Sequence, residues 1–177
     1  MGVCIGDITG KGMPAAMLMA NLQATFRSQG LIHEDCARCL QGTNDMLYRS
    51  TEATKFATFF YGILDTQNST ICFANGGHDA PLLFRKNNSP QELKATGLLL
   101  GIMTDTNYSE EQITLEPNDI LTLYTDGITE AMNPKGELFG TNRFIEIIKH
   151  NQERSAQEIL DLVLQDIRSH ANEAAQS

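Results

Sequence analysis

The sequence predicts an α+β fold with a mostly antiparallel sheet flanked by helices, and this prediction rests on the order of its segments. Helical periodicity occupies both ends of the chain, and strand-like segments joined by short turns lie between them, over residues 56–125. Turns of this length connect antiparallel strands. This order, in which helices are followed by hairpin-linked strands and then by further helices, is typical of α+β proteins. Sheet layers covered by helices are therefore expected.

Two helices are expected before these strands. Apolar residues recur at helical spacing over residues 14–28, and Pro14 suits a first turn because the N–H that it lacks would find no partner there. A second helix is expected over residues 34–49, with Leu40 and Leu47 pointing inward. Three methionines of the first helical segment are expected to fill the core: Met13, Met17 and Met19.

The strands are recognised as apolar runs bounded by turn residues. They are expected over residues 3–5, 56–64, 70–74, 81–84, 112–115 and 119–125. Residues 56–64 are apolar on both faces, as in the central strand of a sheet. The last two strands are joined by a turn at residues 116–118, which favours a hairpin.

The C-terminal part of the chain is expected to be helical. Helices are predicted over residues 141–151 and 155–170. Ser155 and Glu158 match a capping box, in which each side chain bonds the backbone N–H of the other residue at the helix start. Because no internal repeat or linker divides the 177 residues, a single domain over residues 1–177 is expected.

Composition and charge exclude several classes of protein. Apolar residues make up 41% of the chain and charged residues 20%, which is ordinary for a globular domain. A net charge of −9 argues against nucleic-acid binding, which needs a basic face. No apolar run approaches the roughly 20 residues of a membrane-spanning helix, and no secretory signal follows Met1. We therefore expect a cytoplasmic protein with no membrane insertion and no nucleic-acid partner.

The cysteines and histidines are expected to be structural. Cys36 and Cys39 form a C-x-x-C spacing, but no second pair of Cys or His at zinc spacing accompanies them, so reduced thiols are expected. His78 lies in the turn 75–79 (Asn-Gly-Gly-His-Asp), where a histidine bonding local backbone is favoured over a general acid. The other three histidines are expected at the surface: His33, His150 and His170.

Two aspartates follow strand-like segments in glycine-containing turns. Asp7 lies in residues 6–12 (Gly-Asp-Ile-Thr-Gly-Lys-Gly), and Asp126 precedes Gly127. If their strands are neighbours, the carboxylates can converge and hold Mg²⁺ or Mn²⁺, which prefer oxygen ligands. Asp-Gly is also a common turn, so spacing alone leaves a plain turn open. A phosphate-binding P-loop does not fit residues 6–12, because the glycine spacing differs and no Ser or Thr follows the lysine.

Four stretches taken together resemble one family of enzymes. They are residues 6–19, 56–62, 74–83 and 123–131, which contain in that order Gly-Asp-Ile-Thr-Gly-Lys-Gly, Phe-Ala-Thr-Phe-Phe-Tyr-Gly, Asn-Gly-Gly-His and Tyr-Thr-Asp-Gly. Their order and spacing look like the metal-dependent PPM/PP2C-type serine/threonine phosphatases, in the bacterial branch of SpoIIE and RsbU. The similarity runs over nearly the whole chain. It implies an α-β-β-α sandwich of two mostly antiparallel sheets between helical layers.

The resemblance also implies a catalytic site with two Mn²⁺ or Mg²⁺ ions. Asp7 matches a carboxylate that bridges both ions, the backbone carbonyl of Ile8 matches a further ligand, and Asp126 matches a carboxylate on one ion. The ions would activate a water to attack phosphorus and would neutralise the developing charge. The implied substrate is phosphoserine or phosphothreonine on a small bacterial signalling protein, such as an anti-sigma-factor antagonist.

Two motifs of the family lie outside residues 1–177. A Gly-Gly-Asp strand usually precedes the Asp7 motif, and an Asp-Asp motif usually follows the last helix. We therefore expect a partial domain, clipped at both ends, of a longer protein with an upstream sensor domain, and weak or absent turnover by residues 1–177 alone. The alternative is a non-catalytic, phosphatase-like module that binds a signalling partner. A homodimer is among the expected assemblies.

Overall fold

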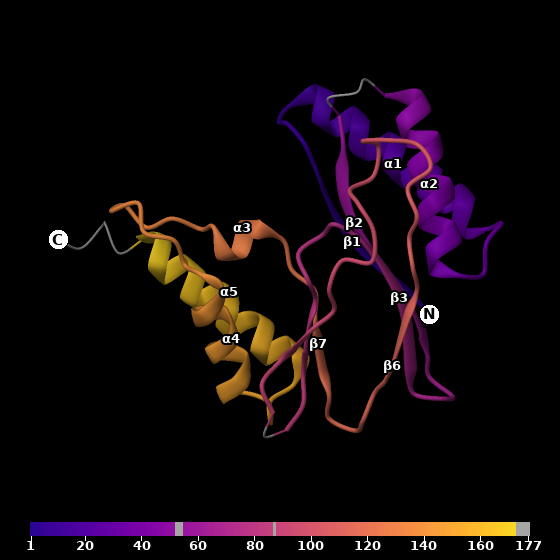
Figure 1. Cartoon of the computed structure of the whole chain (residues 1–177). Helices are drawn as coiled ribbons and strands as arrows, with labels where there is room; N and C mark the ends of the chain where they lie inside the picture. Colours follow the sequence, from indigo (N-terminus) through magenta and orange to yellow (C-terminus); the bar gives the residue numbers. More distant parts are fainter. Residues whose placement is uncertain (52–54, 87, 173–177) are drawn as a thin grey trace. The chain divides into compact units, whose positions relative to one another are not determined.

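The computed structural model describes residues 1–51, 55–86 and 88–172 (Figure 1). Two compact units make up the chain. The first comprises Met1–Ala80 and Leu93–Leu115, and the second comprises Pro81–Glu92 and Glu116–Ser177. A single domain over residues 1–177 stays a prediction.

A four-stranded antiparallel sheet forms the frame of the first unit. Its strand order is β1-β2-β3-β6, with β1 at Gly2–Ile8, β2 at Ala57–Asp65, β3 at Thr70–Gly76 and β6 at Glu111–Thr114. The long apolar strand β2 lies inside this sheet, as predicted, and β1 forms one of its edges. The β2–β3 hairpin pairs Asp65 with Thr70, so the predicted turn lies between them.

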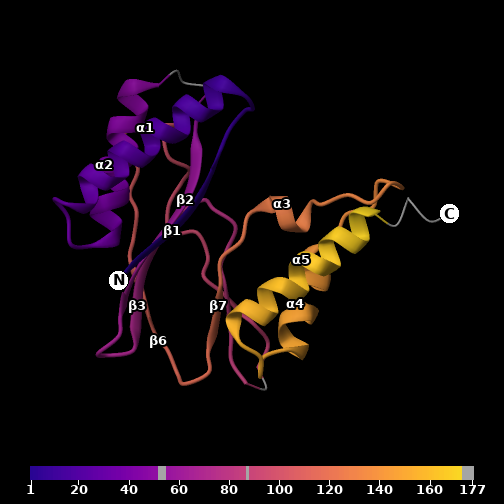
Figure 2. The ribbon, with the colours of Figure 1, turned by 180° about the vertical axis from the view of Figure 1, so that it is seen from behind.

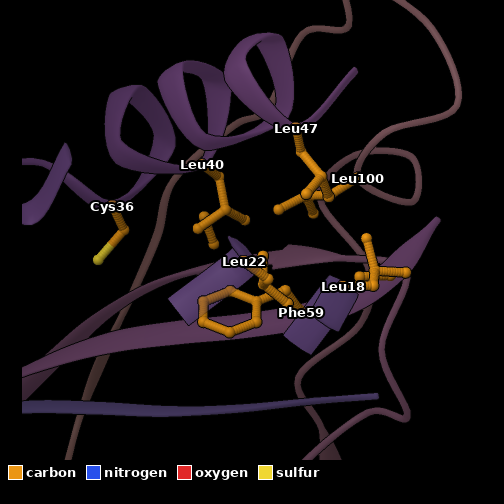
Figure 3. Close-up of a cluster of buried hydrophobic side chains, with 9 residues drawn as sticks. Leu18, Leu22, Cys36, Leu40, Leu47, Phe59 and Leu100 are labelled. Carbon is orange, nitrogen blue, oxygen red and sulfur yellow. The ribbon is translucent and has the colours of Figure 1, made fainter. Parts of the chain in front are cut away.

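Two helices pack against one face of this sheet: α1 at Met13–Gly30 and α2 at Cys36–Ser50 (Figures 1 and 2). Leucines of both helices point toward Phe59 of β2 (Figure 3). The cluster contains Leu18 and Leu22 from α1, Leu40 and Leu47 from α2, and Leu100. Fully burying a side chain of this size stabilises the fold by about 1.5–3 kcal/mol. This cluster therefore fixes the sheet against α1 and α2.

The second unit combines a small antiparallel sheet with three helices. Its strand order is β5-β4-β7, with β4 at Leu82–Phe84, β5 at Gln91–Glu92 and β7 at Ile120–Thr122. The helices are α3 at Asp126–Thr129, α4 at Thr141–His150 and α5 at Ala156–Asn172. Phe84, Tyr124, Phe144, Ile148 and Val163 belong to its core.

The predicted capping box at the start of α5 is present. The backbone N–H of Ser155 donates to Glu158 Oε2 at 2.9 Å, and the N–H of Glu158 donates to Ser155 Oγ at 3.3 Å. Two N–H groups that helix geometry leaves without an intrahelical partner are satisfied in this way. The sequence therefore located the start of this helix correctly.

The prediction that the methionines of α1 fill the core is wrong. Met13 is 74% exposed and Met17 is 68% exposed. The buried stripe of α1 instead includes Ala15, Leu18 and Leu22, at the i, i+3 and i+7 positions of one helix face. Met13 and Met17 are four residues apart on another face, which the sheet does not cover.

The strands around residues 116–118 do not form the predicted hairpin. β6 pairs with β3 in the four-stranded sheet, and β7 pairs with β4 in the three-stranded sheet. The turn between them is closed locally, because Asp119 Oδ2 accepts the N–H of Glu116 at 2.9 Å and lies 3.2 Å from Arg85 Nε. A tight turn therefore joins two sheets here.

The predicted surface position of His170 is also wrong, because this side chain is buried. Its Nε2 lies 3.0 Å from the carbonyl oxygen of Glu137, and its ring packs edge-on against Phe139. His150 is exposed, as predicted. None of the helices in the described ranges combines the length and the hydropathy that a membrane-spanning segment needs.

Candidate metal centre

Asp7 is the sixth residue of β1 and pairs with Thr58 of β2. Side chains alternate between the two faces of a strand. Ile8 packs into the cluster beneath α1 and α2, so Asp7 lies on the opposite face of the sheet, where its side chain is exposed. Asp7 Oδ1 accepts the N–H of Ile8 at 2.8 Å. This bond orients the carboxylate toward the backbone that follows it.

Gly6 allows the two strands to approach closely beside Asp7. A Cβ at this position would lie 2.5 Å from Cδ2 of Phe59 and 2.7 Å from the carbonyl oxygen of Thr58. Any larger residue would push β1 away from β2. The glycine before Asp7 is therefore a packing requirement of this strand pair.

The carbonyl of Ile8 faces away from β2. Ile8 pairs with Ala57, but the N–H of Ala57 donates to the carbonyl of Leu100 at 2.9 Å, and the N–H of Leu100 donates back at 2.8 Å. Ile8 and Ala57 are therefore a non-hydrogen-bonded pair, in which the polar backbone groups point away from the partner strand. Because β1 is an edge strand, the Ile8 carbonyl lies on the open edge of the sheet, on the side where its N–H meets Asp7 Oδ1.

Asp126 lies in the second unit, as the first residue of the short helix α3. It follows the end of β7 by four residues, so it begins a helical turn and does not end a strand. Tyr124 packs on Phe144 with ring centroids 4.9 Å apart, and the N–H of Gly140 donates to the carbonyl of Thr129 at 2.9 Å. These contacts fix both ends of the segment that presents the exposed Asp126 side chain.

The structure thus brings together two of the three predicted ligands. Asp7 and Ile8 offer a carboxylate and a carbonyl on one strand edge, and a shared site with Asp126 stays a prediction. Within the described residues, no three His, Cys, Asp or Glu side chains gather as a metal cluster. Carboxylate and carbonyl oxygens fit Mg²⁺ or Mn²⁺, and Mg²⁺ usually keeps several water ligands. The donors present therefore fit a hydrated divalent cation.

His78 belongs to the same end of the sheet. Its backbone N–H donates to Asn75 Oδ1 at 2.8 Å, as expected of a turn histidine with local bonds. Its ring makes a contact that the sequence did not indicate, because Nδ1 lies 2.8 Å from Thr58 Oγ1. Nothing in the sequence marked Thr58 as a candidate site residue, because it is a single threonine within an apolar strand.

The C-x-x-C cysteines lie in surroundings that favour the neutral thiol. Both side chains are buried, and burial raises the pKa of the Cys39 thiol to about 11. Burial also raises the pKa of Cys36, and the carboxylate of Glu110 raises it further. The reactive and metal-binding form of cysteine is the thiolate, which these shifts disfavour at neutral pH.

The family model for Stage II sporulation protein E (SpoIIE) matches residues 1–176. The chain belongs to the SpoIIE family. Phosphoserine phosphatase RsbU of Bacillus subtilis is 29% identical and aligns with 96% of this chain and 52% of its own length. Protein IcfG of Synechocystis sp. is 28% identical and aligns with 99% of this chain and 32% of its own. This SpoIIE-family chain therefore spans about a third of IcfG and about half of RsbU.

A solved structure shows the same fold. The SiaA-PP2C domain of Pseudomonas aeruginosa superposes with a TM-score of 0.84 at 20% identity, over 99% of this chain and 70% of that one. The α+β fold with two antiparallel sheets that the sequence predicted is confirmed, and it is the fold of PP2C domains.

Proposed function

We propose that this chain is the catalytic part of a metal-dependent protein serine/threonine phosphatase. The substrate would be phosphoserine or phosphothreonine on a bacterial signalling protein, such as an anti-sigma-factor antagonist. One observation carries the proposal: the Asp7 carboxylate and the Ile8 carbonyl lie together on the open edge of β1. Membership of the SpoIIE family and the similarity to the phosphoserine phosphatase RsbU support it.

The cofactor would be two Mn²⁺ or Mg²⁺ ions held by Asp7, the Ile8 carbonyl and Asp126. When bound, such ions supply an activated water and neutralise charge on the phosphoryl oxygens. Their positive charge would also offset part of the net charge of −9, which disfavours the approach of a phosphorylated substrate. Asp7 and Asp126 are thus the proposed catalytic residues.

The protein residues contribute by fixing these oxygen donors in place. The Ile8 N–H holds Asp7 Oδ1, which leaves the second carboxylate oxygen to a ligand. The carbonyl of Asp126 accepts the N–H of Glu130 at 2.7 Å, so the backbone beneath this carboxylate is held within α3. Donors fixed before binding do not have to be reorganised when charge develops on the substrate.

The proposal extends to the setting of the domain. We place it in the cytoplasm, downstream of a sensor domain in the same gene product, and a homodimer is one expected assembly. The non-catalytic alternative is a partner-binding module of the same fold. It differs in predicting binding of the phosphoprotein without release of phosphate.

Turnover by the full product of the gene that encodes this chain tests the proposal. We expect Mn²⁺-dependent release of phosphate from a serine-phosphorylated anti-sigma-factor antagonist, and loss of this release in Asp7→Asn and in Asp126→Asn. Asp105→Asn is the matched control, because Asp105 is an exposed carboxylate in a loop of the first unit. Unchanged turnover in either site variant would refute the assignment, and binding without turnover by the unaltered protein would favour the alternative.

A further inference from the structure

The turn that carries His78 is held by a buried polar network. The side chain of Asn75 is fully buried, and His78 is 5% exposed. Asn75 Oδ1 accepts the N–H of His78 at 2.8 Å, and Nδ2 donates to the carbonyls of His78 at 3.1 Å and Leu93 at 3.2 Å. Burying an amide is unfavourable unless its hydrogen bonds are made. Here three bonds satisfy the amide and clamp the backbone of the histidine.

The backbone of Asn75 is equally well satisfied. Its N–H donates to Thr96 Oγ1 at 2.9 Å, and its carbonyl accepts the N–H of Thr96 at 2.8 Å. Gly77 has a φ of +70°, and a Cβ there would lie 2.4 Å from Cδ2 of Leu99. Fully satisfied buried networks make one conformation much more favourable than its competitors. The fold therefore gives the imidazole of His78 one fixed position.

That position is against Thr58, the cross-strand partner of Asp7. The Nδ1 of His78 lies 2.8 Å from Thr58 Oγ1, and the backbone N–H of Asp7 donates to the same Oγ1 at 3.3 Å. A hydroxyl has one hydrogen and two acceptor sites. Since Thr58 Oγ1 accepts from Asp7, its own hydrogen can be donated to His78 Nδ1. When His78 Nδ1 carries no proton, it accepts this hydrogen, and a chain of hydrogen bonds then runs from Asp7 through Thr58 to His78.

We propose that His78 is a positioning residue for the divalent-cation site and acts on Asp7 through the hydroxyl of Thr58. The chain of bonds fixes the backbone of Asp7 against β2, and with it the edge on which Asp7 and Ile8 present their oxygens. The buried Asn75 holds the histidine of this chain in place. The inference rests on the proposed function, because it requires Asp7 to bind the cation.

Residues that orient metal ligands have a measurable effect on affinity. Removing such a partner typically weakens metal binding or activity about 10- to 100-fold. We therefore expect Thr58→Val and His78→Leu to raise the Mn²⁺ dissociation constant about 10-fold. Thr58→Ser keeps the hydroxyl, and His78→Asn keeps a polar atom near the place of Nδ1, so both should restore most of the affinity.

The test measures Mn²⁺ binding to the full gene product by titration calorimetry, without substrate. Hydrogen exchange of the β1 peptide, followed by mass spectrometry without metal, gives a second readout that needs no activity. We expect faster exchange in Thr58→Val than in Thr58→Ser. Thr70→Val is the matched control, because Thr70 lies at the other end of β2–β3 pairing, opposite Asp65. Melting temperatures without metal show whether each variant is folded.

Two outcomes would overturn the inference. One is unchanged Mn²⁺ affinity in folded Thr58→Val and His78→Leu. The other is equal loss in Thr58→Ser and Thr58→Val, which would mean that the hydroxyl has no part in the effect. Asp7→Asn, measured alongside, separates this failure from failure of the proposed function. If Asp7→Asn binds Mn²⁺ as the unaltered protein does, the metal site itself is misassigned.

Discussion

The guanidinium of Arg143 donates two hydrogen bonds to the carboxylate of Asp166, from Nε to Oδ2 at 2.6 Å and from Nη2 to Oδ1 at 2.9 Å. This bidentate pair joins α4 to α5. The same guanidinium lies 5.0 Å from the ring centroid of Phe139 and 3.3 Å from Nδ1 of His170. The segment that follows α3 is thus attached to both long helices of the second unit.

Asp166→Asn should lower the free energy of unfolding, because it removes the charge that this planar pair depends on. Both side chains are more than a third exposed, so solvent screens the pair and we expect a loss of about 1 kcal/mol. Urea unfolding measures it. Glu153→Gln is the control, since its ion pair with Lys86 is highly exposed and should contribute little. Equal effects in the two variants would contradict the proposed role of the Arg143 pair.

Leu22→Ala should be strongly destabilising, whereas Met17→Ala should be nearly neutral. Leu22 is buried in the cluster between the sheet and the two helices. Deleting its side chain leaves a cavity that lowers the free energy of unfolding by about 2–5 kcal/mol. Met17 is exposed on the uncovered face of α1. Both residues lie on the same helix, so each is the control for the other. Urea unfolding of the two variants would show comparable losses if the methionine were part of the core.

Gly6→Ala should separate β1 from β2 and weaken Mn²⁺ binding. The added Cβ would overlap Phe59 and the Thr58 backbone, and overpacking of this kind costs about 1–3 kcal/mol. Gly30→Ala is the control, because an added Cβ there meets nothing within 4 Å. Thermal unfolding and Mn²⁺ calorimetry read out the two effects. A Gly6→Ala protein as stable as Gly30→Ala would show that the strands do not meet as described.

The capping box of α5 should stabilise the protein at neutral pH and lose its effect in acid. Hydrogen bonds from Ser155 lower the pKa of Glu158 from its ordinary value of 4.5. A group whose pKa is lower in the folded chain stabilises it above the unfolded value, and this contribution disappears as the pH falls through the folded value. Glu158→Gln should therefore have a lower melting temperature than the unaltered protein at pH 7.

The difference in melting temperature between Glu158→Gln and the unaltered protein should shrink well below pH 4.5. There the carboxyl group of Glu158 is protonated in both the folded and the unfolded chain. Glu153→Gln, a change at an exposed glutamate outside the cap, is the comparison. A difference that stays constant across this range would mean that the carboxylate charge of Glu158 does not contribute.

Local sequence signals were enough for most elements of the fold. The starts of α1 and α5 followed from Pro14 and from the Ser155–Glu158 pair, and β2 followed from its apolar run. The methionine prediction failed because α1 is apolar on more than one face, and periodicity alone does not say which face meets a sheet. The hairpin prediction failed because a turn fixes only local geometry, and pairing with β3 and β4 decided the partners of β6 and β7.

The candidate site was only partly visible in the sequence. Asp7 could be found because glycines surround it and because the motif resembles a known family. Thr58 could not, since one threonine in an apolar strand has no local mark of a polar role. His170 was misplaced for a similar reason: its partners Arg143 and Glu137 are distant in sequence, and only packing shows that its ring is buried.

The buried, hydrogen-bonded amide of Asn75 also affects how readily this residue deamidates. Asn75 is followed by Gly76, and Asn-Gly dipeptides deamidate readily. The glycine nitrogen attacks the side-chain carbonyl, ammonia leaves, and water opens the resulting cyclic imide to aspartate or isoaspartate. In the folded chain that carbonyl is held by the N–H of His78, and Gly76 lies within β3. The attack needs a rotation of the side chain that would break these bonds. We therefore expect isoaspartate to form at Asn75 only after local unfolding. The amount of isoaspartate should then increase with the time that the chain spends unfolded.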